Sequence, residues 1–146
     1  MAKPADIDEA EAQAALAVLV ETARGMGVAA AVAILDSGRN LVAFLRMSGT
    51  PLGAIEVAQG KAYTSCSVEM TTADLAPHVL PGAPFYGFAT SHRHPLVVFG
   101  GGVPIRRDGV VVGAVGVSGG SIDEDVSLAE AVAGFLETRS RPQAPR

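Results

Sequence analysis

Tryptophan is absent from this chain of 146 residues, and aromatic side chains make up only 5% of it. Apolar residues nevertheless amount to 49%, so the core must be built from small aliphatic side chains that pack closely. The length is that of one ordinary domain. We therefore expect a single domain over residues 1–146, with frayed tails at residues 1–5 and 139–146.

The chain also lacks the marks of several functional classes. Its one cysteine, Cys66, excludes an intramolecular disulfide and any metal site built from several cysteines, and we expect it buried in a helix. A net charge of -4 without a basic cluster argues against nucleic acid or an anionic membrane as partner. No apolar run reaches the roughly 18 residues of a membrane span, and no signal peptide is recognised. We expect a cytoplasmic protein.

Helical periodicity and strand-like apolar runs alternate along the chain. The segments with helical spacing are residues 6–24, 52–68 and 121–138. The strand-like segments are residues 29–35, 41–47, 96–99 resumed at 103–105, and 110–117. Short turns join these strands into two hairpins, and hairpins place neighbouring strands antiparallel. The pattern predicts an α+β fold, with helices packed on an antiparallel sheet.

Local signals support the helix assignments. Asp6 followed by Glu9, and Ser121 followed by Glu124, are typical of a capping box at a helix start. The middle helix has an apolar side made mostly of small residues, which lets it lie close to the sheet. These residues are Ile55, Ala58, Ala62 and Cys66.

Residues 75–95 form the longest stretch without periodicity. Four of the nine prolines of the chain lie in it, so neither a helix nor a strand is expected. Long ordered loops in compact domains are often functional. We therefore expect this loop to take part in the site.

Several motifs in a fixed order resemble one known family. They are DSGRNLVAFLRM at 36–47, SGTPLG at 48–53, GKA at 60–62, GGVPI at 101–105, DGVVVGAVGVSGG at 108–120, and Asp125 at a helix start. In this order they resemble the GlcG/HbpS-like family, which is related to the C-terminal domain of PduO-type corrinoid adenosyltransferases. The resemblance covers nearly the whole chain.

The resemblance implies a five-stranded antiparallel sheet flanked by helices, profilin-like in outline, and assembly into homo-oligomers. It also implies heme binding for some members of the family. Heme ligation differs between members, so the resemblance assigns no axial ligand here.

His92 and His94 are the sharpest chemical feature of the chain. Imidazole is a natural axial ligand for heme iron and a common metal ligand, and two histidines at i and i+2 lie on one side of an extended segment. His78 could supply a third ligand across the loop. The alternative is that all three are solvent-exposed loop residues.

Two further groups surround this pair. Phe85 and Tyr86, with Phe88, could cover a planar apolar ligand, or could anchor the loop on the core. Gly101 and Gly102 lie where a bulge or bend would let the backbone approach a ligand or another subunit closely.

A second constellation consists of Arg46, Glu56, Lys61 and Tyr63, with Glu56 and Tyr63 on one helical face. In an enzyme, Glu56 would be the general base and Arg46 or Lys61 would hold a carboxylate. The alternative is that Arg46 and Glu56 form a salt bridge and that Lys61 extends along the sheet edge.

Two functions stay open from the sequence. One is a small-ligand-binding protein that resembles heme-binding relatives, with His92, His94, Phe85, Tyr86, Gly101 and Gly102 at the site. The other is a cofactor-free isomerase, hydratase or decarboxylase acting on a carboxylate-bearing metabolite through Glu56 and Arg46. A third possibility is a subunit of an assembly, with the long loop as its interface.

Overall fold

The computed structural model describes residues 3–138, so the expected tail at 139–146 lies outside the described part of the chain. Residues 3–5, which precede the first helix, have no regular secondary structure. The elements are, in chain order, α1 (Glu9–Met26), β1 (Ala31–Asp36), β2 (Leu41–Arg46), α2 (Gly53–Val68), α3 (Thr72–Leu75), two 3-10 turns (Ala76–His78 and Phe88–Thr90), β3 (Gly102–Arg107), β4 (Val110–Ser118) and α4 (Ile122–Thr138).

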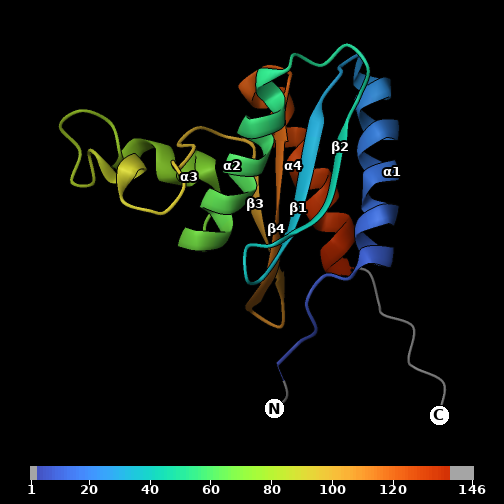
Figure 1. Cartoon of the computed structure of the whole chain (residues 1–146), viewed down its shortest axis with the longest axis horizontal. Coiled ribbons are helices and arrows are strands. Elements are labelled where there is room, and N and C mark those ends of the chain that lie inside the picture. Colours follow the sequence, from blue (N-terminus) through green and yellow to red (C-terminus); the bar gives the residue numbers. More distant parts are fainter. Residues whose placement is uncertain (1–2, 139–146) are drawn as a thin grey trace.

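The strands form one antiparallel sheet in the order β2-β1-β4-β3. Helices α1 and α4 pack against each other and cover one face of the sheet, and α2 crosses the other face (Figure 1). The predicted α+β fold with an antiparallel sheet is therefore confirmed. Within residues 3–138 the sheet has four strands, and the expectation of five is wrong.

The missing strand is the segment at residues 96–99. Its backbone bonds elsewhere, since Leu96 N–H donates to the Ala89 carbonyl at 2.9 Å and Val97 N–H donates to Thr64 Oγ1 at 2.8 Å. A Cβ at Gly60 would lie 2.6 Å from Val97 Cγ2, which shows how closely this segment lies on α2. An apolar run there is satisfied by packing on a helix rather than by pairing in a sheet.

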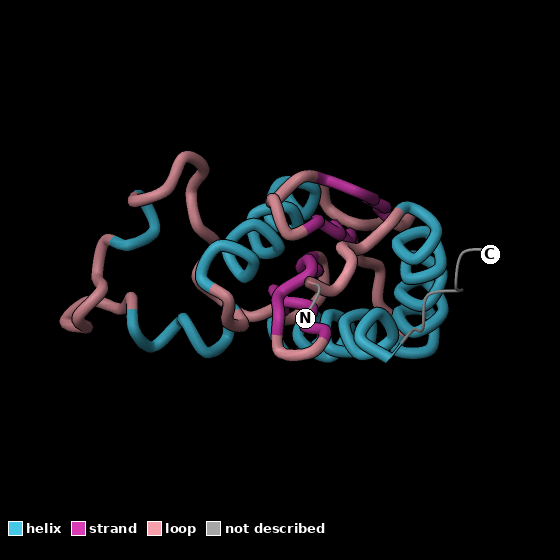
Figure 2. The backbone as a smooth tube through the Cα atoms, turned by 90° about the horizontal axis from the view of Figure 1, so that it is seen from below, coloured by secondary structure: helices cyan, strands magenta, loops and turns pink. Residues whose placement is uncertain are grey.

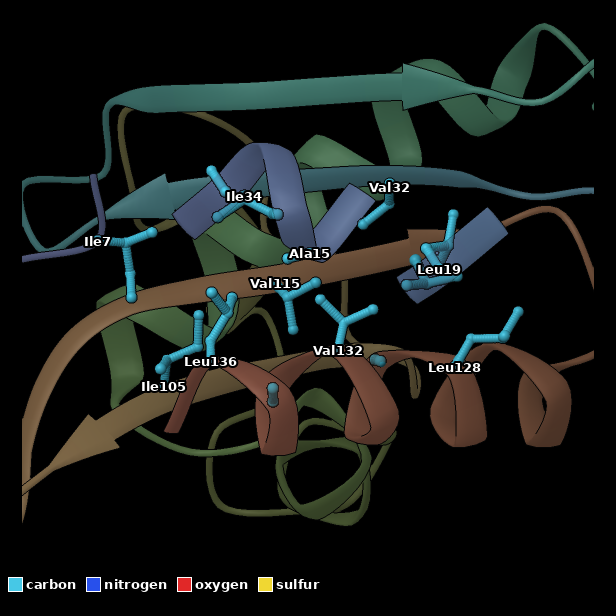
Figure 3. Close-up of a cluster of buried hydrophobic side chains, with 14 of the residues drawn as sticks. Ile7, Ala15, Leu19, Val32, Ile34, Ile105, Val115, Leu128, Val132 and Leu136 are labelled. Carbon is cyan, nitrogen blue, oxygen red and sulfur yellow. The ribbon is translucent and has the colours of Figure 1, made fainter. Parts of the chain in front are cut away.

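The larger core lies between the sheet and the pair α1 and α4 (Figure 3). It consists of aliphatic side chains that are almost completely buried, as expected for a chain without tryptophan. Its larger members include Leu19, Val32, Ile34, Ile105, Val115, Leu128, Val132 and Leu136.

On the opposite face, α2 lies against the sheet through small residues, as predicted. Ala58, Ala62 and Cys66 are buried there, whereas Ile55 is only half-buried. Gly116 of β4 faces this helix, and a Cβ at Gly116 would lie 2.5 Å from Ala62 N and nearer still to the Ala58 carbonyl oxygen. The glycine is required because the backbones of β4 and α2 touch.

One of the two predicted capping boxes is displaced. At α1 the box joins Asp8 and Glu11, not Asp6 and Glu9. Asp6 instead accepts a hydrogen bond from the hydroxyl of Ser37, so its carboxylate joins the segment before α1 to the turn after β1. The box at Ser121 and Glu124 is confirmed, with both reciprocal bonds present at the start of α4.

The remaining long connection projects from the body of the molecule. We call residues 76–95 the arm; it extends away from the sheet beyond α2 and α3 (Figures 1 and 2). Short turns and 3-10 bonds give it local order, for example from Phe85 N–H to the His78 carbonyl at 3.0 Å. The arm returns to the body at His94 and Pro95.

Candidate functional site

A groove of about 660 Å³ runs along α2, between the β1–β2 turn and the end of the arm. Its walls are mostly apolar, and α2 contributes the largest share of them. The lining residues are Leu35, Arg39, Leu41, Glu56, Val57, Gln59, Gly60, Tyr63, His94, Pro95 and Val97. The segments that meet here are up to 62 residues apart in sequence, from 35 to 97, so only the folded chain forms this hollow.

Tyr63 and His94 form the wall of the groove between α2 and the arm. Their ring centroids lie 5.2 Å apart, and the planes are inclined at 80°, an edge-to-face arrangement. Tyr63 is buried, whereas His94 is exposed to solvent. Among residues 3–138 no hydrogen bond holds the His94 imidazole, so its ring nitrogens are open to a ligand in the hollow.

His92 lies behind this wall rather than in the groove. Its ring makes edge-to-face contacts with Phe88 at 5.4 Å and Tyr63 at 6.4 Å between centroids, and its Nδ1 is 2.9 Å from Ser91 Oγ. The structure therefore brings one of the two predicted histidines, His94, to the hollow and uses the other to hold the arm.

His78 is exposed in the first 3-10 turn of the arm and does not line the groove. Among residues 3–138, no group of three or more His, Cys, Asp and Glu side chains is placed to hold a metal ion. His78 therefore supplies no third ligand among the described residues, and its exposure agrees with the alternative, a surface loop residue. Iron already held by a porphyrin needs only axial ligands from the protein.

Arg39 is the site residue that the sequence did not reveal. It lies in the turn between β1 and β2, and its Nη1 donates to Tyr63 Oη and to Ser67 Oγ, both at 3.2 Å. The guanidinium carbon is 5.0 Å from the centroid of the Tyr63 ring, within the range of a cation–π contact. The turn signal was visible in the sequence, but its approach to a helix 24 residues later was not.

Glu56 and Arg46, the pair assigned to an enzyme site, are not brought together. Glu56 lines the groove from the first turn of α2, as does Tyr63 two turns later, so the predicted common face is confirmed. Arg46 lies outside the groove, and its Nη1 donates to the Thr50 carbonyl at 3.2 Å. The predicted Arg46–Glu56 salt bridge is wrong, since the ion pairs among the described residues are Lys61–Asp125 and Arg107–Glu11.

The aromatic residues of the arm do not cover the groove. Phe85 and Tyr86 are 58% and 69% exposed, and neither lines the hollow. Phe88 lies nearer the body, with its ring centroid 6.2 Å from that of Phe85. The structure thus supports neither a lid nor an anchor on the core for Phe85 and Tyr86.

Gly101 and Gly102 are also away from the groove, on the side of α2 that faces the sheet. A Cβ at Gly101, where φ is +127°, would lie 2.7 Å from Lys61 Nζ. A Cβ at Gly102 would lie 2.8 Å from Thr72 Cγ2 and 2.9 Å from the carbonyl carbon of Lys61. The predicted close approach exists, but the neighbour is a helix of the same chain.

Lys61 is completely buried, so the expectation that it extends along the sheet edge is wrong. Its Nζ donates to Asp125 Oδ2 at 3.0 Å and to the Val117 carbonyl at 2.8 Å, and Asp125 Oδ1 accepts from Gly120 N–H at 2.9 Å. Burial lowers the pKa of Lys61 and raises the pKa of Asp125, since it penalises both charges, and their mutual bond offsets part of each shift. The pair joins α2 to the start of α4.

The groove combines features that a flat, largely apolar ligand requires. Its volume is within the range of small-molecule sites, and its aliphatic walls offer apolar contact. His94 supplies an imidazole, and Arg39 supplies a cation at the rim. This donor set fits heme, whose iron accepts a histidine axial ligand and whose carboxylates an arginine can bind. No described helix is long and apolar enough to cross a membrane.

Comparison with known proteins adds a family. A family model described as "Haem degrading protein HbpS-like" matches residues 7–133. A 15.0 kDa protein of Citrobacter freundii, encoded between dhaT and dhaS, is 38% identical over 97 residues, which are 66% of this chain and 68% of that protein. The corrinoid adenosyltransferase PduO of Salmonella typhimurium is 35% identical over 111 residues, which are 76% of this chain but only 33% of PduO.

Solved structures show the same architecture. The Klebsiella pneumoniae protein ORFY is similar with a TM-score of 0.91 and 28% identity, over 96% of this chain and 97% of that chain. A PduOC–heme complex is similar with a TM-score of 0.84 and 30% identity, over 89% of this chain and 94% of that chain. The second of these structures was determined with heme bound.

Proposed function

Because this chain belongs to the HbpS-like family, we propose that it is a heme-binding protein whose site is the groove along α2. The observation that carries the proposal is the exposed imidazole of His94, set against buried Tyr63 at the wall of an apolar hollow. A bound heme would supply iron, which takes an imidazole as axial ligand. The heme complex of a similar structure supports the choice of ligand.

Each wall of the groove has a part in this proposal. Leu35, Leu41 and Val57 offer aliphatic contact to the porphyrin face, and such burial favours binding by removing apolar surface from water. Tyr63 fixes the position of the His94 ring, because edge-to-face packing disfavours other orientations. His94 is therefore our candidate for the axial ligand, in preference to His92.

The alternative of a cofactor-free enzyme has no comparable support. The predicted form of it requires Glu56 and Arg46 at one place, and Arg46 lies outside the groove that Glu56 lines. The comparisons name a heme-related family rather than an isomerase, hydratase or decarboxylase. We therefore retain the binding function.

The test is a hemin titration in which binding is followed by the Soret band. Because the chain has few histidines, each of them can be tested by substitution. The chain has three, so His94→Ala, His92→Ala and His78→Ala form a complete set. We expect the wild type to give a shifted Soret band, His94→Ala to lose the shift and bind at least about tenfold more weakly, and His78→Ala to match the wild type. His92→Ala should bind with at most a small loss, because His92 only supports the wall.

Three results would contradict the proposal in whole or in part. A wild-type spectrum equal to that of free hemin would remove heme as the ligand. A His94→Ala spectrum equal to that of the wild type would remove His94 as axial ligand, and loss of the shift in His92→Ala alone would transfer the role to that residue.

We also propose that the chain forms homo-oligomers through the tip of the arm. Leu80, Phe85 and Tyr86 are 56%, 58% and 69% exposed, and they gather on a segment that projects from the body. Large apolar side chains left in water on such a projection favour contact with another chain. A second copy of this chain is the partner that we propose.

Light scattering on the eluting protein tests this assembly. We expect the wild type to have a mass that is a multiple of 14.8 kDa, and Phe85→Ser with Tyr86→Ser to shift it toward 14.8 kDa. Leu52→Ser is the matched control, because Leu52 is 73% exposed but lies outside the arm. A monomeric wild type, or an unchanged mass in the double variant, would reject the arm as interface.

A further inference from the structure

We infer that Arg39 and Glu56 give the groove a direction, so that the ligand binds with its carboxylate edge at Arg39 and its uncharged edge at Glu56. Both residues line the groove, and they carry opposite charges. The inference rests on the proposed function, since it concerns the same groove. It adds the class of ligand, an apolar ring system with acidic groups on one edge, and the residue that selects it.

The guanidinium of Arg39 lacks an ion-pair partner among the described residues. Its two hydrogen bonds run from Nη1 to the neutral hydroxyls of Tyr63 and Ser67. Among the residues that the structure describes, no carboxylate forms an ion pair with it, and Nε and Nη2 donate to no protein group. A guanidinium with free donors at the rim of a hollow is suited to a carboxylate, which it can bind through two parallel hydrogen bonds.

The backbone of the β1–β2 turn holds Arg39 in this place. Asp36 Oδ1 accepts from Gly38 N–H and from Asn40 N–H, both at 2.9 Å, and so fixes the turn on either side of the arginine. Arg39 itself has φ of +67°, a region common for glycine and asparagine and uncommon for arginine. A fixed backbone and two side-chain bonds mean that little freedom is lost when a ligand binds.

Glu56 lies toward the other end of the groove. It precedes Tyr63 by seven residues on α2, which places it about 10 Å along the helix axis from the residue that holds Arg39. It is exposed, and among the described residues it forms no ion pair. A carboxylate there repels an acidic group of the ligand and so favours the orientation that places that group at Arg39.

This polarity matches the chemistry of a porphyrin dicarboxylate. Protoporphyrin IX has both propionates on one edge of an otherwise apolar ring, so one orientation places the acidic edge at Arg39 and the hydrocarbon edge at Glu56. The opposite orientation would place two carboxylates beside a third. Charge thus favours the orientation that places the acidic edge at Arg39.

The test uses metal-free protoporphyrin IX and its dimethyl ester, with binding followed by fluorescence. Without iron there is no axial bond, and the two probes differ only at the propionate edge, where the ester has two neutral methyl ester groups in place of the carboxylates. We expect the wild type to prefer the free acid by about tenfold or more, as for a charge-assisted hydrogen bond. Arg39→Gln should reduce this preference to near one, and Glu56→Gln should increase it.

Arg46→Gln is the matched control, since it removes a cation that lies outside the groove and should keep the wild-type preference. The two proposals can fail separately. If His94→Ala leaves hemin binding unchanged, His94 is rejected as the axial ligand, but the inference on Arg39 and Glu56 still stands.

An equal preference in Arg39→Gln and the wild type would overturn the inference even if hemin binds. A wild type that binds acid and ester equally would do the same. If neither porphyrin binds, the groove is not a porphyrin site, and the inference falls together with the proposed function.

Discussion

A pair of opposite charges lies on each of two sides of helix α2, and the two pairs differ in burial and in pairing. On the side toward β4 and α4, Lys61 and Asp125 are buried and bonded to each other at 3.0 Å. On the side toward the groove, Arg39 and Glu56 are exposed, and neither has a partner of opposite charge among the described residues. Burial of an unpaired charge costs far more than its exposure, so the first pair has a structural role. The second pair stays exposed at the groove, where we propose that it acts on a ligand.

The largest effect that this comparison predicts is at Lys61. Lys61→Met keeps the length of the side chain but leaves Asp125 buried without its counter-ion, so the free energy of unfolding should fall by about 3–5 kcal/mol. Urea unfolding measures this change. Arg93→Met removes an exposed cation of the arm and should change stability by at most about 0.5 kcal/mol.

A second substitution sharpens this result. Asp125→Asn in the Lys61→Met background removes the orphaned charge and should recover part of the lost stability. A loss under about 1 kcal/mol in Lys61→Met, with no recovery in the double variant, would show that the pair is not structural.

The next effect concerns the close contact of α2 with the sheet. Gly116→Ala would force a methyl group against the backbone of α2 at Ala58 and Ala62, and overpacking of this kind costs about 1–3 kcal/mol. Gly134→Ala on α4 meets nothing within 4 Å and should instead raise the free energy of unfolding by about 0.5–1 kcal/mol, since alanine favours a helix. Thermal unfolding measures both variants. If Gly116→Ala and Gly134→Ala changed the stability in the same direction, this packing would be contradicted.

Cys66 gives a smaller effect that depends on pH. Cys66→Ala removes a buried group about the size of a methylene and should cost about 1 kcal/mol at neutral pH. Burial raises the pKa of the thiol above its ordinary value of 9.0, so the folded state holds this proton more tightly than the unfolded state. The contribution is therefore complete below pH 9.0 and is lost as pH rises through the folded pKa. Denaturant unfolding at a series of rising pH values should show the free energy of unfolding of the wild type approaching that of Cys66→Ala. A difference between the two that widens above pH 9.0 would refute this.

The smallest effect on stability belongs to the groove. His94→Ala removes an exposed ring that packs edge-to-face on Tyr63, so the free energy of unfolding should change by at most about 0.5 kcal/mol. This separates a binding role from a structural one, because the same variant should lose the Soret shift. A large loss of stability would show that His94 has a structural role, as Lys61 has, rather than a binding role in the groove.

Much of the fold could be predicted because its signals are local. The hairpin turns, the capping box at Ser121 and the small residues of α2 are each read within a few positions. The segment at 96–99 was misassigned for a physical reason: an apolar run satisfies the strand pattern equally well when it packs on a helix, and only the bond to Thr64 Oγ1 distinguishes the two.

The site was predicted in part, and the errors are long-range. Glu56 and Tyr63 were identified by their common helical face and the histidines by residue type, but the sequence could not distinguish His94, which lines the groove, from His92, which does not. Arg39 was read only as a turn residue, and the burial of Lys61 depends on Asp125, which is 64 positions away. Pairings of this kind are determined by the packing of the whole chain.

A crystal structure of the protein grown with hemin tests the central proposal most directly. We expect porphyrin density in the groove along α2, with iron at His94 and the propionate edge at Arg39. Porphyrin bound at the arm tip beside Phe85 and Tyr86, or at Phe99 above Lys61, with the groove empty, would contradict it.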